Sequence, residues 1–348
     1  MLKKRQFLRL GAAAVLGAPF AASHGAPLVT LKFQSFVPAS ANIWARVITP
    51  WMQKVERESG GRIKFEGYTS MQLGGTAPQL LDQARDGVVD LVWTLTGYTA
   101  GRFLASEVFE LPFMTYDAEG SSKAAWEFMH THAAGELKDV KYLAIHTHGL
   151  NVLHTRRKSV RTAADLRGMK VRGPSRRATQ MLSALGAIPV GMPLPQIPDA
   201  LSKGTIEAAM IPWDTAPAAK LDELTTNHTE FPKGMPGLNN SIQILVMNAN
   251  SYAALPADLK KVIDDNSGLE VSGWFGRQVS AYDPVVRKAV IDRGNTVHVV
   301  DKADAQVFMQ RTESVVQDWV KDMNERGADG TKLLASARAL IAKYKPVV

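Results

Sequence analysis

The chain contains no cysteine among its 348 residues. Disulfides, thiolate metal sites and thiol nucleophiles are therefore all excluded. No apolar run approaches the roughly 20 residues that a membrane-spanning helix needs, and there is no low-complexity tract. The hydrophobic fraction of 45% and the charged fraction of 21% are typical of a globular protein. A chain of this length predicts two domains. Because no run is long enough to span a membrane, we expect no stable membrane insertion.

Acidic residues are missing from the first 25 residues, which we predict to be an export signal. Lys3, Lys4, Arg5 and Arg9 precede a short apolar stretch, and small residues follow it. Removal of these four basic residues lowers the formal net charge from +8 to +4. So small a charge, with one tight basic cluster at Arg156 to Lys158, does not indicate a nucleic-acid partner. We expect an exported, periplasmic protein.

Catalytic and cofactor motifs are also absent from the sequence. There is no Gly-x-Ser-x-Gly elbow, and the glycine pairs lack the spacing of a phosphate-binding loop. His146, His148 and His154 have no carboxylate at the spacing of a metal ligand. The sequence therefore predicts neither an enzyme nor a protein with a cofactor.

Two segments repeat the same order of strands and helices. In the first, a strand at 29–36 and a helix at 44–55 are followed by a strand at 63–68, a helix at 78–86 and a strand at 88–93. In the second, a strand ending at Arg172 and a helix at 176–185 are followed by a turn at 187–190, a helix at 196–203 and a strand at 205–211. Both carry the pattern Asp-x-x-x-x-Gly-x-apolar-acid, at 82–90 and 199–207. The repetition predicts two similar α/β lobes with a cleft between them.

Arg172 lies where a predicted strand runs into a helix, in the segment Lys170-Val171-Arg172-Gly173-Pro174. Ligands of such sheets bind beyond the carboxyl ends of the strands. A guanidinium offers a planar fork to a carboxylate, and the start of a helix adds free N–H groups. The position is therefore a candidate carboxylate-binding site.

The C-terminal third has an apolar pattern compatible with a helix from Pro256 to Val290, about 35 residues against a typical dozen. We expect Asp283-Pro284 to kink or break this helix. A helix of this length has to cross from one lobe to the other.

From Leu28 to Tyr344 the chain resembles the extracytoplasmic solute receptors of tripartite ATP-independent periplasmic (TRAP) transporters, the C4-dicarboxylate-binding family. The matching landmarks, in order, are Met71-Gln72-Leu73-Gly74-Gly75, Asp86-Gly87-Val88-Val89-Asp90, Glu110-Leu111-Pro112-Phe113, the segment from Asp165 to Pro174, Leu185-Gly186-Ala187-Ile188-Pro189, Ala200-Leu201-Ser202-Lys203-Gly204, Met247-Asn248 and Leu255-Pro256-Ala257-Asp258-Leu259. The resemblance implies an α/β, two-lobed periplasmic solute-binding protein fold with a long inter-lobe helix. We place lobe I at 27–148 plus 240–278, and lobe II at 149–239 plus 279–348.

The resemblance also implies a set of ligand-binding residues. The family's selectivity arginine matches Arg172, and a further polar position matches Asn151. The family's Asp-Gly-x-x-Asn-Pro pattern is replaced by Glu207-Ala208 and Ile211-Pro212, which disfavours dicarboxylates and sialic acid. Trp213, Asp214, Trp93, Thr94 and Asn240 complete the candidate set.

Two indoles in one cleft would suit a monocarboxylate with an apolar or aromatic body. Asp214 near an anion has to accept a solute hydroxyl or, with Asn151, bind a cation. For the tryptophans, core packing is an equal alternative, and for Asn240 a role in a turn.

The resemblance implies that the protein captures a small organic acid between its lobes and delivers it to the membrane subunits of a TRAP permease. Two alternatives stay open. One is a ligand receptor for a membrane sensor kinase, and the other is a periplasmic enzyme on the same scaffold. The missing catalytic motifs disfavour the enzyme.

Overall fold

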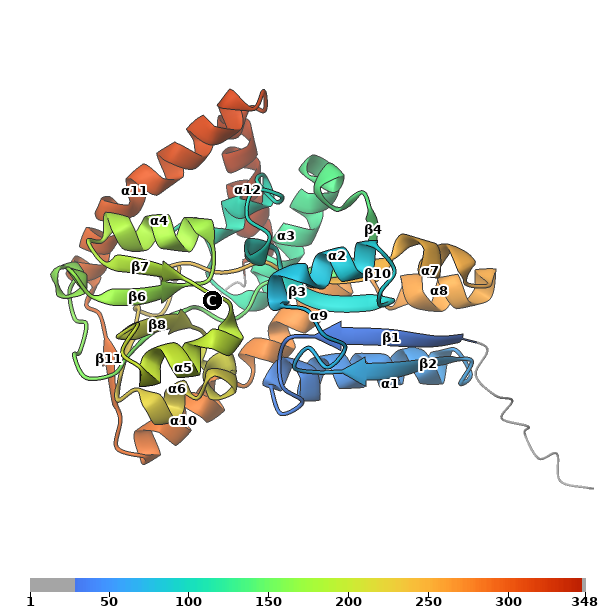
Figure 1. Ribbon diagram of the computed structural model, residues 1–348. Helices are drawn as coiled ribbons and strands as arrows, with labels where there is room; N and C mark the ends of the chain where they lie inside the picture. The colour runs from blue at the N-terminus through green and yellow to red at the C-terminus, as the bar shows by residue number, and fades with distance from the viewer. Residues whose placement is uncertain (1–28, 346–348) are drawn as a thin grey trace, which may run out of the picture.

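The computed structural model describes residues 29–345 and shows two α/β lobes side by side (Figure 1). The two-lobed α/β prediction is confirmed. The predicted export signal, residues 1–25, lies outside the described residues. Within residues 29–345, no helix is long and apolar enough to cross a membrane.

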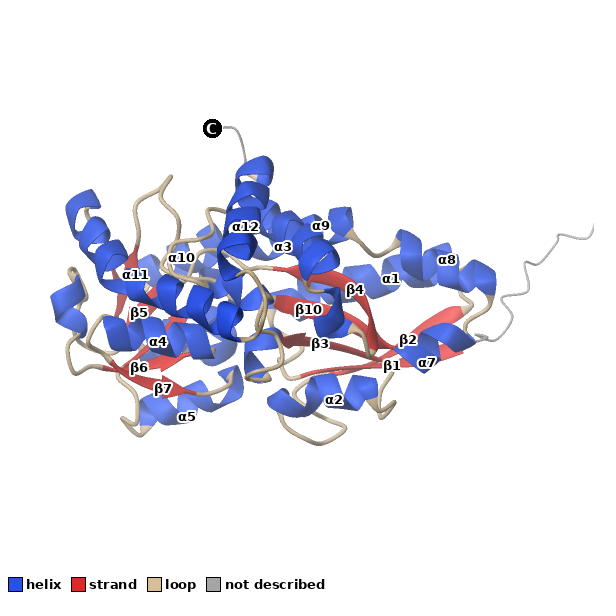
Figure 2. Ribbon diagram, turned by 90° about the horizontal axis from the view of Figure 1, so that it is seen from above, coloured by secondary structure: helices blue, strands red, loops and turns tan. Residues whose placement is uncertain are grey.

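The first lobe is built around a five-stranded sheet with the order β2-β1-β3-β10-β4. In Figure 2, α2 lies on one face of this sheet, and α3 and α9 lie on the other. The strands are β1 (Val29–Ser35), β2 (Ile63–Tyr68), β3 (Leu91–Leu95), β4 (Val140–His146) and β10 (Gln243–Asn248). The helices are α1 (Thr49–Glu58), α2 (Leu80–Arg85), α3 (Ala118–His132), α7 (Ala249–Ala254), α8 (Ala257–Asp265) and α9 (Leu269–Ser280).

The second lobe holds a six-stranded sheet with the order β11-β9-β5-β8-β6-β7. Its strands are β5 (Val152–Thr155), β6 (Lys170–Gly173), β7 (Ile188–Gly191), β8 (Ala208–Ile211), β9 (Asn227–Glu230) and β11 (Thr296–Val299). The helices that follow in the chain are α4 (Arg176–Ala184), α5 (Ile197–Ser202), α6 (Leu221–Leu224), α10 (Asp283–Asp292), α11 (Lys302–Glu325) and α12 (Gly330–Tyr344). The segment 187–190, which the sequence suggests is a turn, forms most of β7, because it pairs in parallel with β6.

The repeated acids have equivalent structural roles in the two sheets. Asp90 accepts the backbone N–H of Lys32, the β1 residue beside it, at 2.8 Å. Glu207 accepts the backbone N–H of Lys170 on β6 at 3.0 Å. Asp90 thus links the start of β3 to β1, and Glu207 links the start of β8 to β6, so the repeat extends to side-chain contacts.

Each sheet also contains one antiparallel strand that the sequence pattern does not reveal. β10 lies antiparallel between β3 and β4, and β5 lies antiparallel between β8 and β9. β4 leads directly into β5 through residues 147–151, and β9 leads back into β10 through residues 231–242. The chain therefore crosses between the lobes along two strand connections.

The expected single long helix is divided in the structure. Gly268, with φ of 102°, separates α8 from α9, because a residue with a side chain rarely adopts this backbone conformation. Ala281 and Tyr282 keep right-handed helical dihedrals between α9 and α10. The inter-lobe helix is thus a kinked one from Leu269 to Asp292, bent just before Pro284 as expected.

The last two helices connect the lobes again. α11 packs against α4 of the second lobe, whereas α12 packs against α3 of the first. In the predicted boundaries, residues 279–348 all belong to lobe II. Those boundaries stay a prediction, and α12 is the element whose packing partner lies in the other lobe.

Candidate functional site

A cavity lies between the lobes. Residues after β1 and on β3 line it from the first lobe, and residues on β6 and β8 line it from the second. The crossing segment 147–151 contributes as well. A cavity enclosed by two lobes and their connections suits a small molecule bound by lobe closure.

Arg172 is the cation of this cavity, and it has no opposite charge within ion-pair distance. Its side chain is 3% exposed, and no described carboxylate lies within 4 Å of its guanidinium. Nε donates to the carbonyl of Met192 at 2.9 Å, and Nη1 donates to the carbonyl of Met210 at 3.3 Å. Burial lowers the pKa of Arg172, and the phenol of Tyr98 beside it partly offsets this. A buried cation with carbonyls and a phenol around it, and no carboxylate, favours an anionic ligand.

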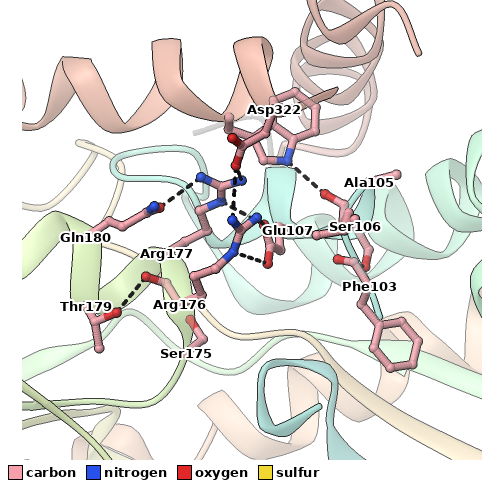
Figure 3. A network of polar contacts seen from close by, with 12 residues as sticks. Phe103, Ala105, Ser106, Glu107, Ser175, Arg176, Arg177, Thr179, Gln180 and Asp322 are labelled. Carbon is pink, nitrogen blue, oxygen red and sulfur yellow. Dashed lines mark hydrogen bonds and ion pairs between the residues drawn. The ribbon is translucent and has the colours of Figure 1, made fainter. Parts of the chain in front are cut away.

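The neighbouring arginines are already paired. Figure 3 shows Arg176 and Arg177, at the start of α4, between Glu107 and Asp322. Glu107 lies 2.7 Å from both guanidinium groups, and Asp322 lies 3.0 Å from Arg176 and 2.8 Å from Arg177. Of the three arginines near this strand end, Arg172 alone is among the residues that line the cavity.

Aromatic rings form one wall of the cavity. Phe36 stacks on Trp93 with ring centroids 5.4 Å apart, and Tyr98 meets Phe36 edge-on at 5.3 Å. The indole Nε1 of Trp93 donates to Nε2 of His146 at 2.9 Å, so its polar edge is satisfied inside the protein. The rest of the indole is available as an apolar surface.

Trp213 does not share this wall, and the expectation of two indoles in the cleft needs correction. Trp213 is absent from the cavity lining. Its Nε1 donates to Glu230 Oε1 at 2.7 Å, and its ring packs against His154 and His228. The packing alternative therefore describes Trp213.

Of the remaining predicted residues, one lines the cavity and two do not. Asn151 lines the cavity, while its Nδ2 donates to Asn239 Oδ1 at 2.8 Å. Thr94 does not line it, since alternate residues of a strand face opposite sides. Asn240 is fully engaged within the protein: it accepts from the N–H groups of His148 and Ser241 and donates to His148 and Thr115. Asn240 therefore bonds one crossing segment, residues 231–242, to the other, residues 147–151.

The polar end of the cavity contains Asp214 and Asn42. Asp214 is 4% exposed, and burial raises its pKa. Among the described residues, no three His, Asp or Glu side chains are placed to hold a metal ion. The alternative of a cation between Asp214 and Asn151 stays a prediction, because Asn151 bonds to Asn239 through Nδ2 and not through the Oδ1 that would hold a cation.

Sequence reasoning missed most of the lining, including Phe36, Asn42, Tyr98, His148 and Met210. One of them could have been found from the repeat. Trp93 follows Asp90 by three residues, and Met210 follows Glu207 by the same interval, so the two residues are equivalent positions that face one cavity. Phe36, Asn42 and Tyr98 lie in connections after strands, where local pattern carries no such signal.

His148 contributes a neutral imidazole. Burial lowers its pKa to about 4, and the positive charge of Arg172 acts in the same direction. Nδ1 faces the carbonyl of Gly149 at 2.6 Å and must carry the proton. Nε2 is thereby left as a hydrogen-bond acceptor.

Comparison with known proteins identifies the family. The family model for "Bacterial extracellular solute-binding protein, family 7" matches residues 33–322. A TRAP solute-binding protein from Rhodoferax ferrireducens, crystallised with copurified benzoate, is 54% identical with a TM-score of 0.90, and the match covers 91% of this chain and 98% of that one.

Two further crystal structures are similar. A marine metagenome TRAP protein specific for aromatic acids, in complex with 3-hydroxybenzoate, is 45% identical (TM-score 0.90, 92% of this chain and 100% of that one). A Bordetella bronchiseptica TRAP protein with bound mandelate is 28% identical (TM-score 0.82, 90% and 99%). The chain therefore belongs to family 7 of the bacterial extracellular solute-binding proteins, the periplasmic receptors that capture organic acids for TRAP permeases.

Proposed function

We propose that this receptor binds an aromatic monocarboxylate, with Arg172 holding the carboxylate and the wall of Phe36, Trp93 and Tyr98 holding the ring. The observation that carries the proposal is the buried Arg172 guanidinium, which lines a cavity with an aromatic wall and has no carboxylate partner. A single cation balances a single carboxylate. A second carboxylate on the ligand would come close to Asp214 with no cation to receive it.

The similar proteins support this class of ligand, because their structures hold benzoate, 3-hydroxybenzoate and mandelate. Each is an aromatic acid with one carboxylate. In this proposal the second lobe supplies Arg172 and the first lobe supplies the aromatic wall, so the ligand stabilises the closed arrangement of the lobes. The acid is released to the permease without chemical change.

The proposal is tested with the purified mature protein and a ligand panel. Thermal shift and calorimetry should show binding of benzoate, 3-hydroxybenzoate or mandelate, and little effect of succinate, pyruvate, sialic acid or glucose. A ligand present at 100 times its dissociation constant stabilises the fold by about 2.7 kcal/mol. Nuclear magnetic resonance of the released ligand should show the acid unaltered. Binding confined to dicarboxylates or sugars would overturn the proposal, and a changed acid would point to an enzyme.

A further inference from the structure

Asp214 reaches the cavity from the second lobe with unused hydrogen-bonding capacity. Its Oδ1 accepts a hydrogen bond from the hydroxyl of Thr215 at 3.2 Å, and its Oδ2 has only a long contact of 3.5 Å with Nδ2 of Asn42. No Lys, Arg or His among the described residues lies within ion-pair distance of it. A buried carboxyl group with so few donors is costly to leave unsatisfied.

Asn42 meets Asp214 from the first lobe and has the same shortage. Its Nδ2 donates to the carbonyl of Val279 at 3.2 Å, which fixes the orientation of the amide. Its Oδ1 is then buried without a hydrogen-bond partner, in a residue that is only 6% exposed and lines the cavity. The two side chains thus meet from opposite lobes at one part of the cavity, and each keeps an oxygen with unused capacity to accept a hydrogen bond.

We propose that Asp214 and Asn42 form a subsite for a hydrogen-bond donor on the ring of the ligand, so that the receptor selects hydroxylated aromatic acids over unsubstituted ones. This inference rests on the proposed function, because it assumes that an aromatic acid occupies the cavity. An unsubstituted ring would leave both acceptors unpaired, and a site built to bond a hydroxyl discriminates strongly against the analogue that lacks it.

The chemistry of the subsite favours a neutral donor. Arg172 already balances the ligand carboxylate, and a phenolic hydroxyl adds no charge. A metal ion is not favoured, since no three His, Asp or Glu side chains of the described residues converge at this place. The hydroxyl donates to Asp214 or to Asn42 Oδ1 while its own oxygen lies near the Thr215 hydroxyl.

Ligand chemistry provides the first arm of the test. Calorimetry compares benzoate with its 2-, 3- and 4-hydroxy, fluoro and methoxy derivatives, so that at each ring position one substituent donates and two do not. We expect one hydroxy isomer to bind at least about tenfold more tightly than benzoate and than the matching fluoro and methoxy compounds. Benzoate that binds as tightly as all three hydroxy isomers would overturn the inference and leave the proposed function intact.

Protein variants provide the second arm. In Asp214→Leu and in Asn42→Leu the preference for the best hydroxy isomer over benzoate should fall at least threefold. Asp199→Asn, on the exposed face of α5, is the control and should keep the full preference. If both cavity variants still prefer the hydroxy isomer over benzoate, the hydroxyl must donate to another acceptor, such as His148 Nε2. This result would overturn the assignment of the subsite to Asp214 and Asn42. If neither variant folds, the ligand series on the wild-type protein still decides whether a donor is selected.

Discussion

The guanidinium of Arg172 is fastened through its Nε to the carbonyl of Met192, across the adjacent strand β7, at 2.9 Å. This bond and the one to Met210 occupy two of its five N–H groups, and the rest stay available to a ligand. An arginine anchored in this way is oriented before the ligand arrives, which lowers the entropic cost of binding.

Arg172→Ala should weaken binding of the best aromatic acid by about 2–5 kcal/mol, the range for truncating one member of a buried charged pair. Arg172→Lys should recover only part of this, because an ammonium group keeps the charge but loses the planar fork. Calorimetry measures both, and the exposed Arg157→Ala serves as the control. Near wild-type affinity in a folded Arg172→Ala protein would remove Arg172 from the site.

Trp93→Phe should abolish most of the change in tryptophan fluorescence on ligand binding, because the indole of Trp93 lines the cavity. Trp213→Phe should retain that change, since Trp213 packs against His154 and His228 outside the lining. Fluorescence titration with the same acid compares the two matched variants. The reverse result would place Trp213 at the ligand.

Glu107→Gln should destabilise the protein by about 3 kcal/mol, because Arg177 is 0% exposed and would lose its closest carboxylate. The loss should lie at the lower end of the range for a broken buried pair, since Asp322 still contacts both arginines. Urea unfolding measures the change. Asp199→Asn, an exposed ion-pair variant, should change stability by less than about 1 kcal/mol. Equal effects in the two variants would contradict a structural role for Glu107.

A fall in pH should lower the free energy of unfolding through His154 and His228, whose Nδ1 atoms lie 2.7 Å apart. Burial lowers the pKa of His154 to about 3 and that of His228 to about 4, against about 6.5 in the unfolded chain. Because the pKa values of both histidines are lower in the folded than in the unfolded protein, the folded state keeps its full stability from this pair above pH 6.5. That stability is lost as the pH falls towards 4. The slope is at most about 1.4 kcal/mol per pH unit for each histidine.

His228→Asn should therefore show a shallower loss of unfolding free energy between pH 6.5 and 5 than wild type does. Glu110 and Glu136, whose pKa burial raises to about 7, act in the opposite direction. They are the same in both proteins, so the difference isolates the histidine pair. The exposed His130→Asn is the control. Parallel curves for wild type and His228→Asn would refute this source of acid sensitivity.

The local sequence pattern was sufficient to predict most helices and strands and to select Arg172 as a candidate site residue. The strand at Ile63–Tyr68 has the predicted bounds, and the break before Pro284 follows from the backbone geometry of proline. Arg172 could be selected because a strand end, a helix start and a family motif coincide there.

The partners of the crossing strands could not be predicted in this way. β10 pairs with β3 and β4, which lie far away in the chain, and a short apolar run carries no information about such partners. The same limit applies to Asn42 and Tyr98, whose places in the cavity depend on how loops fold over it. The repeated acids align Trp93 with Met210 and not with Trp213, and Trp213 is absent from the lining.

The central position of β10 also governs when the molecule can fold. Since β10 fills the gap between β3 and β4, the first sheet cannot be completed until residue 248 has been synthesised. The second sheet waits longer, because its edge strand β11 ends at Val299. A growing chain therefore carries one edge of β3 and the whole of β4 unpaired, and fragments cut between the lobes should aggregate rather than fold as separate halves.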